Sequence, residues 1–420
     1  MTERLLQFIW QFQYFNLYEL QTEAGEALQI IHPGQLNTNQ GPDFLAAKIK
    51  IDNTVLAGSV ELHLQSSGWD RHRHQHDVNY NNVILHVVWE DDVKQLTGMP
   101  VFVLQHRVSK PLLQQYHQWM QQPAFIPCAG FVTHVKKLVW LTWKERLLAE
   151  RMQRKTQYVL QLLQRNNNHW EETCWQLLAK IFGLKVNAEA FEAIARSLPV
   201  AILAKHKNQL PTLEALLLGQ AGLLEGQFAE AYPRLLQREY NFYRHKYQLQ
   251  QPNNPVHFLR MRPAAFPTVR LAQLATLVYN ASHLFSTIKE AATIQEITKR
   301  LNITAADYWH YHYRLDEPSL FKKKNLGRDM INNILINTIT PVLFAYGLYH
   351  NEQAIKDKAL LWLEATGAEK NNLTKGWQQL GVAIYNAWDS QALIELKTQY
   401  CDKKRCLDCA VGNALLKRWK

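Results

Sequence analysis

Hydrophobic periodicity divides this chain of 420 residues near residue 125. Before that point, short apolar segments alternate with turn residues, a pattern typical of β-strands. After it, apolar residues recur at the spacing of α-helices, and strand-like alternation is scarce. The expected strands are residues 27–31, 46–51, 59–64, 83–89 and 101–104. The sequence therefore predicts the α+β class, with a small N-terminal α/β domain followed by a large all-helical domain.

We expect the domains to comprise residues 1–125, residues 126–395 and a cysteine-containing C-terminal segment, residues 396–420. The first domain should also contain helices at residues 3–15 and 110–121. Residues 83–89 are nearly all apolar, which indicates a central strand buried on both faces. Residues 122–130 contain two prolines between segments of different pattern, so they form the predicted linker.

The composition is that of a soluble globular protein, with 47% hydrophobic and 20% charged residues. No apolar run reaches the length that spans a bilayer, and the N-terminus lacks the features of a secretion signal. We therefore expect a cytoplasmic protein without a membrane partner. The net charge of +11 favours a polyanionic partner, usually nucleic acid, either DNA or RNA. A solvated basic surface that binds nothing in particular is the alternative.

Side chains of the kinds that bind metal ions are concentrated in the first quarter of the chain. They are Asp43, Glu61, His63, His72, His74, His76 and Asp77. A purely structural domain does not need so many ligand-type residues so close together, whereas a metal site does. The leading interpretation is a metal-dependent enzyme.

Strand geometry predicts how part of this cluster assembles. Because side chains alternate between the two faces of a strand, Glu61 and His63 should point the same way. Asp43 follows a Gly-Pro turn at the start of another strand, and pairing of the two strands would bring it beside Glu61. Neighbouring carboxylates repel each other, and a divalent cation removes that repulsion. We expect Mg²⁺ or Mn²⁺, with Zn²⁺ as an alternative.

The histidines that follow Trp69 extend the predicted site. In an extended segment, His72, His74 and His76 would point their imidazoles to one face, which suits Zn²⁺ or Mn²⁺. A solvated loop at a polar strand edge would have the same sequence. His86, in the apolar strand, is expected to be a hydrogen-bonded core residue. The predicted metal ligands are Asp43, Glu61, His74 and His76, and the predicted catalytic residues are His63, His72 and Asp77.

Pro42-Asp43 followed by Glu61-Leu62-His63 resembles the PD-(D/E)xK nuclease superfamily. In that superfamily the Asp and the Glu hold Mg²⁺, and a Lys two residues after the Glu helps to handle the attacking water. Here His63 stands in place of the lysine, and a histidine can also act as a base or a ligand. The resemblance implies a restriction-endonuclease-like fold for the N-terminal domain, with Asp43 and Glu61 on the metal ion.

The order of the motifs is also similar to that of the very-short-patch repair endonucleases. Those enzymes carry a Pro-Asp-Phe, a strand ending in Val-x-His and a Trp-His-x-His stretch. The corresponding residues here are 42–44, 61–63 and 69–74, with a longer spacing after the Trp. This analogy makes Glu3, on the first helix, a third acidic candidate.

A longer pattern is similar to an uncharacterised bacterial family, a domain of unknown function. Its signature resembles Gly-Pro-Asp-Phe, Val-Glu-x-His, Trp-x-x-His-x-His and Tyr-Asn-Asn-Val-Ile-Leu-His-Val-Val, found here at residues 41–44, 60–63, 69–74 and 80–88. The resemblance runs through most of the chain, including residues 262–271 and the terminal cysteines. It implies no established activity.

Four arginines are candidates for binding phosphate, namely Arg71, Arg73, Arg262 and Arg270. A planar guanidinium can donate two parallel hydrogen bonds to phosphate oxygens. Arg71 and Arg73 lie within the histidine-rich segment. Arg262 and Arg270 flank a proline-containing stretch near a helix start, where helix capping explains part of the pattern.

Three of the five cysteines lie together near the C-terminus, as Cys401-x4-Cys406-x2-Cys409. Disulfides are uncommon in cytoplasmic proteins, so this spacing points to a metal or a cluster. Cys128, in the predicted linker, or Cys174 could supply a fourth ligand. The pattern is similar to iron–sulfur nucleases and glycosylases that close a helical segment with three late cysteines. An iron–sulfur cluster, a zinc ion and unligated thiols are the three alternatives.

The residues and the resemblances favour a metal-dependent nuclease-like phosphodiesterase that acts on nucleic acid. Asp43 and Glu61 would hold the ion, and His63 or His72 would take or position the proton. The alternative is a non-catalytic nucleic-acid or protein-interaction module on a decayed nuclease fold, which the missing lysine favours. A third interpretation is a metallohydrolase that acts on a small phosphorylated substrate.

Overall fold

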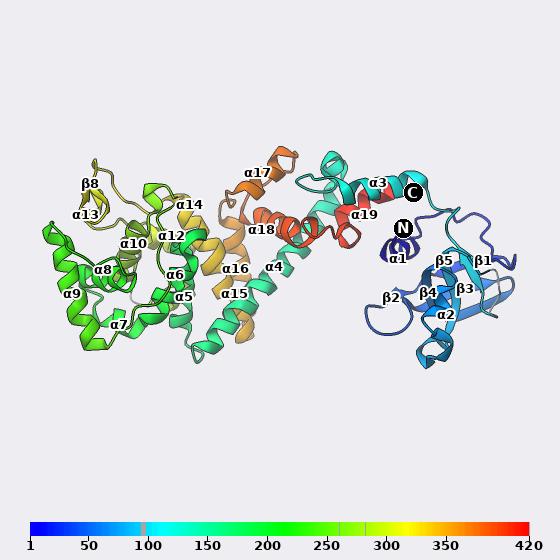
Figure 1. Cartoon of the computed structure of the whole chain (residues 1–420), viewed down its shortest axis with the longest axis horizontal. Helices are drawn as coiled ribbons and strands as arrows, with labels where there is room; N and C mark the ends of the chain where they lie inside the picture. The colour runs from blue at the N-terminus through cyan, green and yellow to red at the C-terminus, as the bar shows by residue number, and fades with distance from the viewer. Residues whose placement is uncertain (94–97, 260, 282, 420) are drawn as a thin grey trace. The chain divides into compact units, whose positions relative to one another are not determined.

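The structure, a computed structural model, describes residues 1–93, 98–259, 261–281 and 283–419 (Figure 1). Contacts divide the chain into two compact units. The first unit contains Met1–Trp143, Leu380–Val382 and Leu396–Lys420, and the second contains Lys144–Gln379 and Ala383–Glu395. The architecture is α+β, as expected, because strands concentrate near the N-terminus and helices follow.

The first unit contains a mixed β-sheet (Figure 1). Its strands are β1 (Leu28–His32), β2 (Gln35–Leu36), β3 (Phe44–Ile51), β4 (Thr54–Gln65), β5 (Val83–Glu90) and β6 (Val101–Val103). The strand order is β1-β3-β4-β5-β6, and β2 also pairs with β3. The pairs from β1 to β4 are antiparallel, whereas β4, β5 and β6 run parallel. The apolar strand β5 is therefore an interior strand, as predicted.

Helix α1 (Glu3–Gln11) packs against β4 and β2. The Thr2 hydroxyl accepts a hydrogen bond from the Leu5 N–H at 3.2 Å and caps the first turn. The apolar face of the helix, which includes Ile9, is buried. The helix ends before residue 15, the predicted end, because Gln13 adopts a φ of 52°, which a right-handed helix cannot contain.

The C-terminal segment belongs to the first unit. The helical elements that accompany the sheet are α3 (Lys110–Gln121), η3 (Ala129–His134), η6 (Leu396–Cys401), η7 (Cys406–Asp408), α19 (Ala410–Leu416) and η8 (Lys417–Trp419). The Arg4 guanidinium of α1 donates to both carboxylate oxygens of Asp408 at 2.6 Å. The Tyr14 hydroxyl donates to Asn413 Oδ1 at 2.5 Å. Residues from both ends of the chain thus complete one compact unit.

Helices make up most of the second unit (Figure 1). From residue 137 onward the elements are α4 (Lys137–Arg165), α5 (Trp170–Phe182), α6 (Leu184–Ser197), α7 (Val200–Lys205), α8 (Leu210–Gln220), α9 (Ala231–Tyr247), η4 (Pro263–Ala265), α10 (Pro267–Asn280), α11 (Leu284–Glu290), α12 (Ile294–Leu301), α13 (Asp307–His310), α14 (Arg328–Ile334), η5 (Leu335–Ile339), α15 (Thr340–Tyr349), α16 (Gln353–Ala365), α17 (Asn372–Gln379) and α18 (Ala387–Glu395). A short hairpin of β7 (His312–Arg314) and β8 (Glu317–Pro318) departs from the expected all-helical pattern. Its turn contains Asp316 at a φ of 58°, a conformation that Asp tolerates better than most residues.

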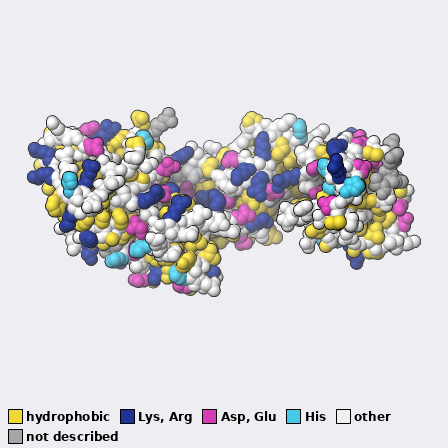
Figure 2. Space-filling view, turned by 60° about the horizontal axis from the view of Figure 1, so that its bottom comes forward, with side chains coloured by type: hydrophobic (Ala, Val, Ile, Leu, Met, Phe, Trp, Pro, Cys, Tyr) yellow, Lys and Arg dark blue, Asp and Glu magenta, His cyan; other side chains and the backbone are white. Residues whose placement is uncertain are grey.

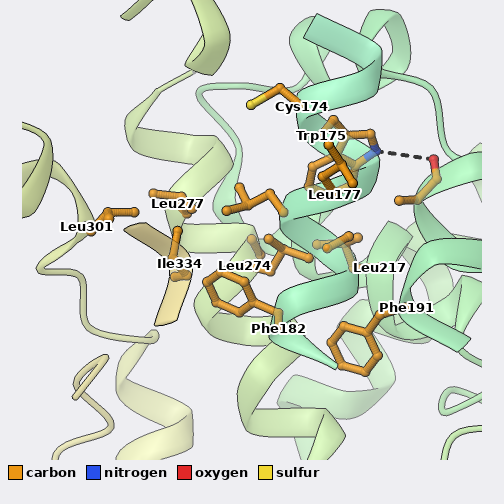
Figure 3. Packing of buried hydrophobic residues seen from close by; sticks show 14 of the residues in the cluster. Cys174, Trp175, Leu177, Phe182, Phe191, Leu217, Leu274, Leu277, Leu301 and Ile334 are labelled. Carbon is orange, nitrogen blue, oxygen red and sulfur yellow. Dashed lines mark hydrogen bonds between the residues drawn. The ribbon is translucent and has the colours of Figure 1, made fainter. Parts of the chain in front are cut away.

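The core of the second unit includes residues of α5, α8 and α10 (Figure 3). Phe182, Leu217 and Leu274 are fully buried, and burying a side chain of this size contributes about 1.5–3 kcal/mol. The Trp175 indole N–H donates to the Ala195 carbonyl at 3.2 Å, which satisfies a buried donor. Helix α8 is buried along most of its length, as is typical of a helix enclosed by others.

Among the described residues, one helical stretch, Arg328–Tyr349, is long and apolar enough to cross a bilayer by length and composition alone. Of its most apolar window, 67% is buried inside the protein, as in the core helix of a soluble protein. Polar residues interrupt the stretch, so it does not form a continuous apolar run in the sequence. Its π-helical turn, η5, precedes Pro341, whose ring and missing N–H are incompatible with a regular α-helical bond to the preceding turn.

We expect Glu214 to make the stability of the second unit depend on pH. Its fully buried side chain accepts hydrogen bonds at Oε2 from the Tyr232 hydroxyl at 2.9 Å and the Trp309 indole N–H at 2.8 Å. Burial raises the pKa of Glu214 to about 7, although both hydrogen bonds lower it. The unfolded chain, with a pKa of 4.5 for this group, therefore loses the proton at a lower pH than the folded chain.

We expect the folding stability to fall as the pH rises from 4.5 to 7, and Glu214→Gln to remove that loss. Relative to the wild type, the free energy of unfolding of the variant should rise by up to about 3 kcal/mol between about pH 5 and pH 8. Urea unfolding at both pH values measures the difference. Glu290→Gln, an exposed control, should show no such change. A difference for Glu214→Gln that does not vary with pH would contradict this assignment.

Candidate functional site

The carboxylates of Asp43 and Glu61 lie side by side in the first unit. The register of β3 and β4 pairs Phe44 with Val60, which brings the residue before β3 next to β4. The Asp43 N–H donates to Glu61 Oε2 at 3.0 Å, and the Leu62 N–H donates to Asp43 Oδ2 at 3.1 Å. These two backbone hydrogen bonds hold the carboxylates side by side. The sequence analysis expected this neighbourhood from pairing of the two strands.

Helix α1 adds a side chain that the sequence analysis did not identify. Gln7 Nε2 donates to Asp43 Oδ1 at 2.8 Å. The charge of Glu3, one turn earlier on the same helix, acts on both Asp43 and Glu61. Residues four apart share one face of a helix, so the spacing of Glu3 and Gln7 is the signal that could have pointed to Gln7.

Burial makes the negative charges of the two carboxylates unfavourable. It raises the pKa of Asp43 to about 6 and that of Glu61 to about 8. For Glu61 the charge of Asp43 adds to the effect of burial, and the hydrogen bond from the Asp43 backbone only partly opposes it. A bound cation would reverse this penalty, since it stabilises the ionised form of both groups.

Three imidazoles converge next to Glu61. One ring nitrogen each of His63, His72 and His74 lies within 4.8 Å of the others. His63 Nε2 lies 3.1 Å from His72 Nδ1. Glu61 Oε1 lies 3.4 Å from His74 Nε2 and 3.7 Å from His63 Nε2. Glu61 and His63 thus reach the same side of β4, as their alternation predicted. We call His63, His72 and His74 the imidazole group.

Burial holds members of the imidazole group in their neutral form. It lowers the pKa of His63 to about 3 and also lowers that of His74, and charges on neighbouring imidazoles add to both effects. His63 Nδ1 lies 2.9 Å from Nε2 of His86, whose pKa burial lowers to about 4. His86 is therefore a hydrogen-bonded core residue, as predicted. A neutral imidazole offers a lone pair to a metal, and a hydrogen bond at its other nitrogen orients it.

The histidine-rich segment is not extended. It forms α2 (Gly68–Arg71), η1 (His74–His76) and η2 (Val78–Tyr80). Arg73, at a φ of 58°, redirects the chain between α2 and η1. The expectation that an extended chain presents His72, His74 and His76 on one face is therefore wrong. These turns bring His72 and His74 to His63, whereas His76 is exposed and lies outside the imidazole group.

Neighbouring residues fix the position of this segment. Gly68 lets the chain pass close to His63, because a Cβ at this position would lie 2.8 Å from His63 Cδ2. The His74 ring stacks on Tyr80 with a centroid distance of 3.8 Å. His74 Nε2 is buried and has no hydrogen-bond partner in the described part of the chain. Because Glu61 Oε1 is its near neighbour, a cation between the two atoms would satisfy both.

Asp77 and the arginines of this segment make local contacts. The Asp77 side chain accepts a hydrogen bond from the Asn79 N–H at 2.9 Å and caps η2. Arg71 donates to Ser67 Oγ at 3.0 Å, and both Arg71 and Arg73 are exposed. Figure 2 shows histidine, basic and acidic side chains gathered on one exposed face of the sheet-containing part. The arginines are thus accessible to a ligand from solvent.

The other predicted site residues divide between the two units. Arg262 and Arg270 belong to the second unit, where Arg270 Nη1 donates to Gln273 Oε1 at 2.9 Å. Burial lowers the pKa of Arg270 to about 10. Cys174 lies in the core of the second unit. The first unit contains Cys128, Cys401, Cys406 and Cys409. Cys128 is therefore the candidate fourth ligand that shares a unit with the terminal three.

A family match covers the candidate site and most of the chain. Residues 3–372 match the family described as Protein of unknown function (DUF2851). No curated protein and no solved structure shows a match to the chain. The family match confirms the resemblance that the motif signature indicated. The chain belongs to the DUF2851 family of proteins of unknown function.

Proposed function

We propose that the first unit is a metal-dependent, nuclease-like phosphodiesterase that acts on nucleic acid. The observation that carries the proposal is the pair of carboxylates of Asp43 and Glu61, which are fixed by backbone hydrogen bonds beside the imidazole group. Mutual repulsion and burial make such a pair unfavourable without a cation. Strongly shifted pKa values of this kind cluster at functional sites.

The order of elements supports the same proposal. Helix α1 precedes the antiparallel strands β1, β3 and β4, and β5 then runs parallel to β4. The two carboxylates come from the start of β3 and from within β4. This order is consistent with the restriction-endonuclease-like fold that the resemblance to the PD-(D/E)xK nucleases implies.

Asp43, Glu61 and His74 are the proposed metal ligands. A donor set of carboxylates and imidazole suits Mn²⁺ or Zn²⁺ better than Mg²⁺, which prefers oxygen ligands. When bound, the ion would polarise a phosphoryl oxygen and lower the pKa of a bound water. His63 is held neutral, and His86 orients its ring through Nδ1. Because burial disfavours a protonated His63, this residue would position the attacking water through Nε2, and the exposed His72, whose Nδ1 lies 3.1 Å from that atom, would take the proton.

Exposed basic residues near the imidazole group support an anionic substrate. Arg71, His72 and Arg73 are all exposed, and the whole chain has a net charge of +11. Guanidinium groups bind phosphate oxygens through paired hydrogen bonds. A nucleic-acid strand is a polyanion that such a surface attracts from a distance.

A non-catalytic nucleic-acid or protein-interaction module on a decayed nuclease fold is the second candidate. The observation that favours it is His63, which stands at the lysine position of the nuclease pattern and is only 3% exposed. A buried imidazole exchanges protons with solvent less readily than a flexible lysine does. A nuclease and a nucleic-acid module both bind nucleic acid, and only the nuclease cleaves it; a protein-interaction module does neither.

The proposal predicts cleavage that depends on both carboxylates. With Mn²⁺ present, the wild-type chain should cut DNA or RNA. Asp43→Asn and Glu61→Gln should each lower the rate by roughly 100-fold or more, because each removes a charged group that acts on the transition state. Electrophoresis of end-labelled single- and double-stranded oligonucleotides measures the rate.

Asp52→Asn is the matched control for these variants. Asp52 lies just beyond the other end of β3, and Asn tolerates its positive φ of 47°. This variant should keep the wild-type rate. Binding of nucleic acid without cutting would transfer support to the non-catalytic module. Absence of both binding and cutting would reject the phosphodiesterase and the nucleic-acid module, and would leave the protein-interaction module as the candidate.

His74 and His76 are matched probes of the metal site, because both lie in η1 and only His74 belongs to the imidazole group. We expect His74→Ala to weaken Mn²⁺ binding by about 10- to 100-fold, and His76→Ala to leave it unchanged. A Mn²⁺ titration that follows the electron paramagnetic resonance signal of the free ion measures the affinity. If both substitutions changed the Mn²⁺ affinity equally, the assignment of His74, and not His76, as a metal ligand would be wrong.

A further inference from the structure

Four cysteines from two distant segments of the chain meet in the first unit. Cys128 immediately precedes η3, whereas Cys401, Cys406 and Cys409 lie in the C-terminal segment. Elements η3 and η7 both pack against α19, and η6 packs against η7. All four are free thiols. Packing of these short elements therefore assembles cysteines that the sequence separates widely.

The backbone of the C-terminal segment folds back on itself between its cysteines. Lys404, at a φ of 51°, donates its N–H to the Cys401 carbonyl at 3.1 Å. The Cys409 N–H donates to the Cys406 carbonyl at 3.3 Å. A Cβ at Gly412 would lie 2.3 Å from the Cys406 carbonyl oxygen, so a larger residue does not fit there. The close spacing of this segment thus depends on a specific glycine.

The four thiols are close enough for their charges to interact. Cys128, Cys406 and Cys409 are at most 7% exposed. Burial raises the pKa of each of the four thiols, and a thiolate at Cys409 would raise the pKa of the other three further. The packing of η3 and η7 against α19, and of η6 against η7, accounts for this interaction, because it gathers the segments that carry these cysteines.

The environment of Cys174 differs from that of the four cysteines of the first unit. It lies fully buried on α5, within the hydrophobic core of the second unit. Burial raises its pKa, and the charge that adds to this effect belongs to Glu171, not to another thiol. Isolated buried cysteines of this kind behave as small apolar residues. The four cysteines of the first unit have a different environment, because each interacts with other thiols.

Polar neighbours partly oppose the effect of burial on these thiols. The backbone N–H groups of Val411 and Gly412 hydrogen-bond the Cys409 side chain, and bonds of this type to sulfur tune metal-bound thiolates. The charges of Lys397 and Lys404 act against the effect of burial on two of the other cysteines. A centre with four thiolates carries net negative charge, which these lysines would offset.

We propose that Cys128, Cys401, Cys406 and Cys409 bind an iron–sulfur cluster. Thiolates on a single zinc ion, with bonds of about 2.3 Å, lie roughly 4 Å apart. Among the described residues, no three of these sulfur atoms all lie within 4.8 Å of one another. In a four-cysteine cluster several irons separate the thiolates more widely. A single zinc ion would therefore require the sulfur atoms to move closer together, whereas a cluster bridges wider separations.

The cluster would fasten the C-terminal segment to the rest of the first unit. This segment contributes Asp408 and Asn413, which bind Arg4 and Tyr14 from the N-terminal region. Cys128 is the single ligand that comes from outside the segment. Because metal binding stabilises the folded arrangement of its ligands, loss of the cluster should loosen these contacts.

The full chain, purified without oxygen, tests the proposal through its content of iron, acid-labile sulfide and zinc. We expect iron and sulfide in equal amounts, about two or about four of each per chain, with the visible absorption of a cluster. Cys128→Ser and Cys409→Ser should lose both. Cys174→Ser removes the buried cysteine of the second unit and should retain both.

Other outcomes would overturn the proposal. Stoichiometric zinc without sulfide would overturn the iron–sulfur assignment. Absence of metal from the wild-type chain, or full retention of iron by Cys409→Ser, would overturn the site itself. If Cys409→Ser does not fold, Cys401→Ser provides a second variant, because Cys401 is partly exposed. Its loss of iron with unchanged circular dichroism would support the site, and retention would overturn it.

Discussion

The structure of the first unit depends on the contact between the start of β3 and the middle of β4. The register of these strands shifts between Phe44 and Ala47, where Ala46 adopts a φ of 54°. Next to this irregularity, the backbone N–H groups of Asp43 and Leu62 donate to the side-chain carboxylates of Glu61 and Asp43. The sheet therefore holds a buried Glu61 beside a partly buried Asp43. This arrangement costs desolvation free energy unless a cation offsets the charge.

The neighbouring histidines do not supply the positive charge that the two carboxylates need. Burial disfavours the protonated form of His63 and His74, so these residues do not neutralise the carboxylates as ordinary ion-pair partners would. A divalent metal ion meets both requirements, because it accepts lone pairs from neutral imidazoles and stabilises ionised carboxylates. Such an ion would bind the folded chain in preference to the unfolded one, because only the folded chain brings these ligands together. It would therefore raise the stability of the first unit as its concentration rises.

Local sequence patterns were sufficient to predict part of the candidate site. Strand alternation placed Glu61 and His63 on one face, because periodicity alone determines which side chains share a face. The turns around Arg73 were not predictable in this way, because the sequence has no glycine or asparagine there to indicate a left-handed residue. The ion pair of Arg4 with Asp408 joins opposite ends of the chain. No local pattern encodes such a contact, and the place of the C-terminal segment in the first unit follows from packing.

Helix α1 connects the two candidate centres of the first unit. It presents Gln7 to Asp43, and it binds the C-terminal segment through Arg4. If the cysteine centre holds that segment in place, it also restricts α1 and thus the carboxylate that Gln7 positions. Coupling between two binding sites is reciprocal in free energy. A metal ion at Asp43 and Glu61 would therefore strengthen, by the same amount, the attachment of the segment that carries three of the four cysteines.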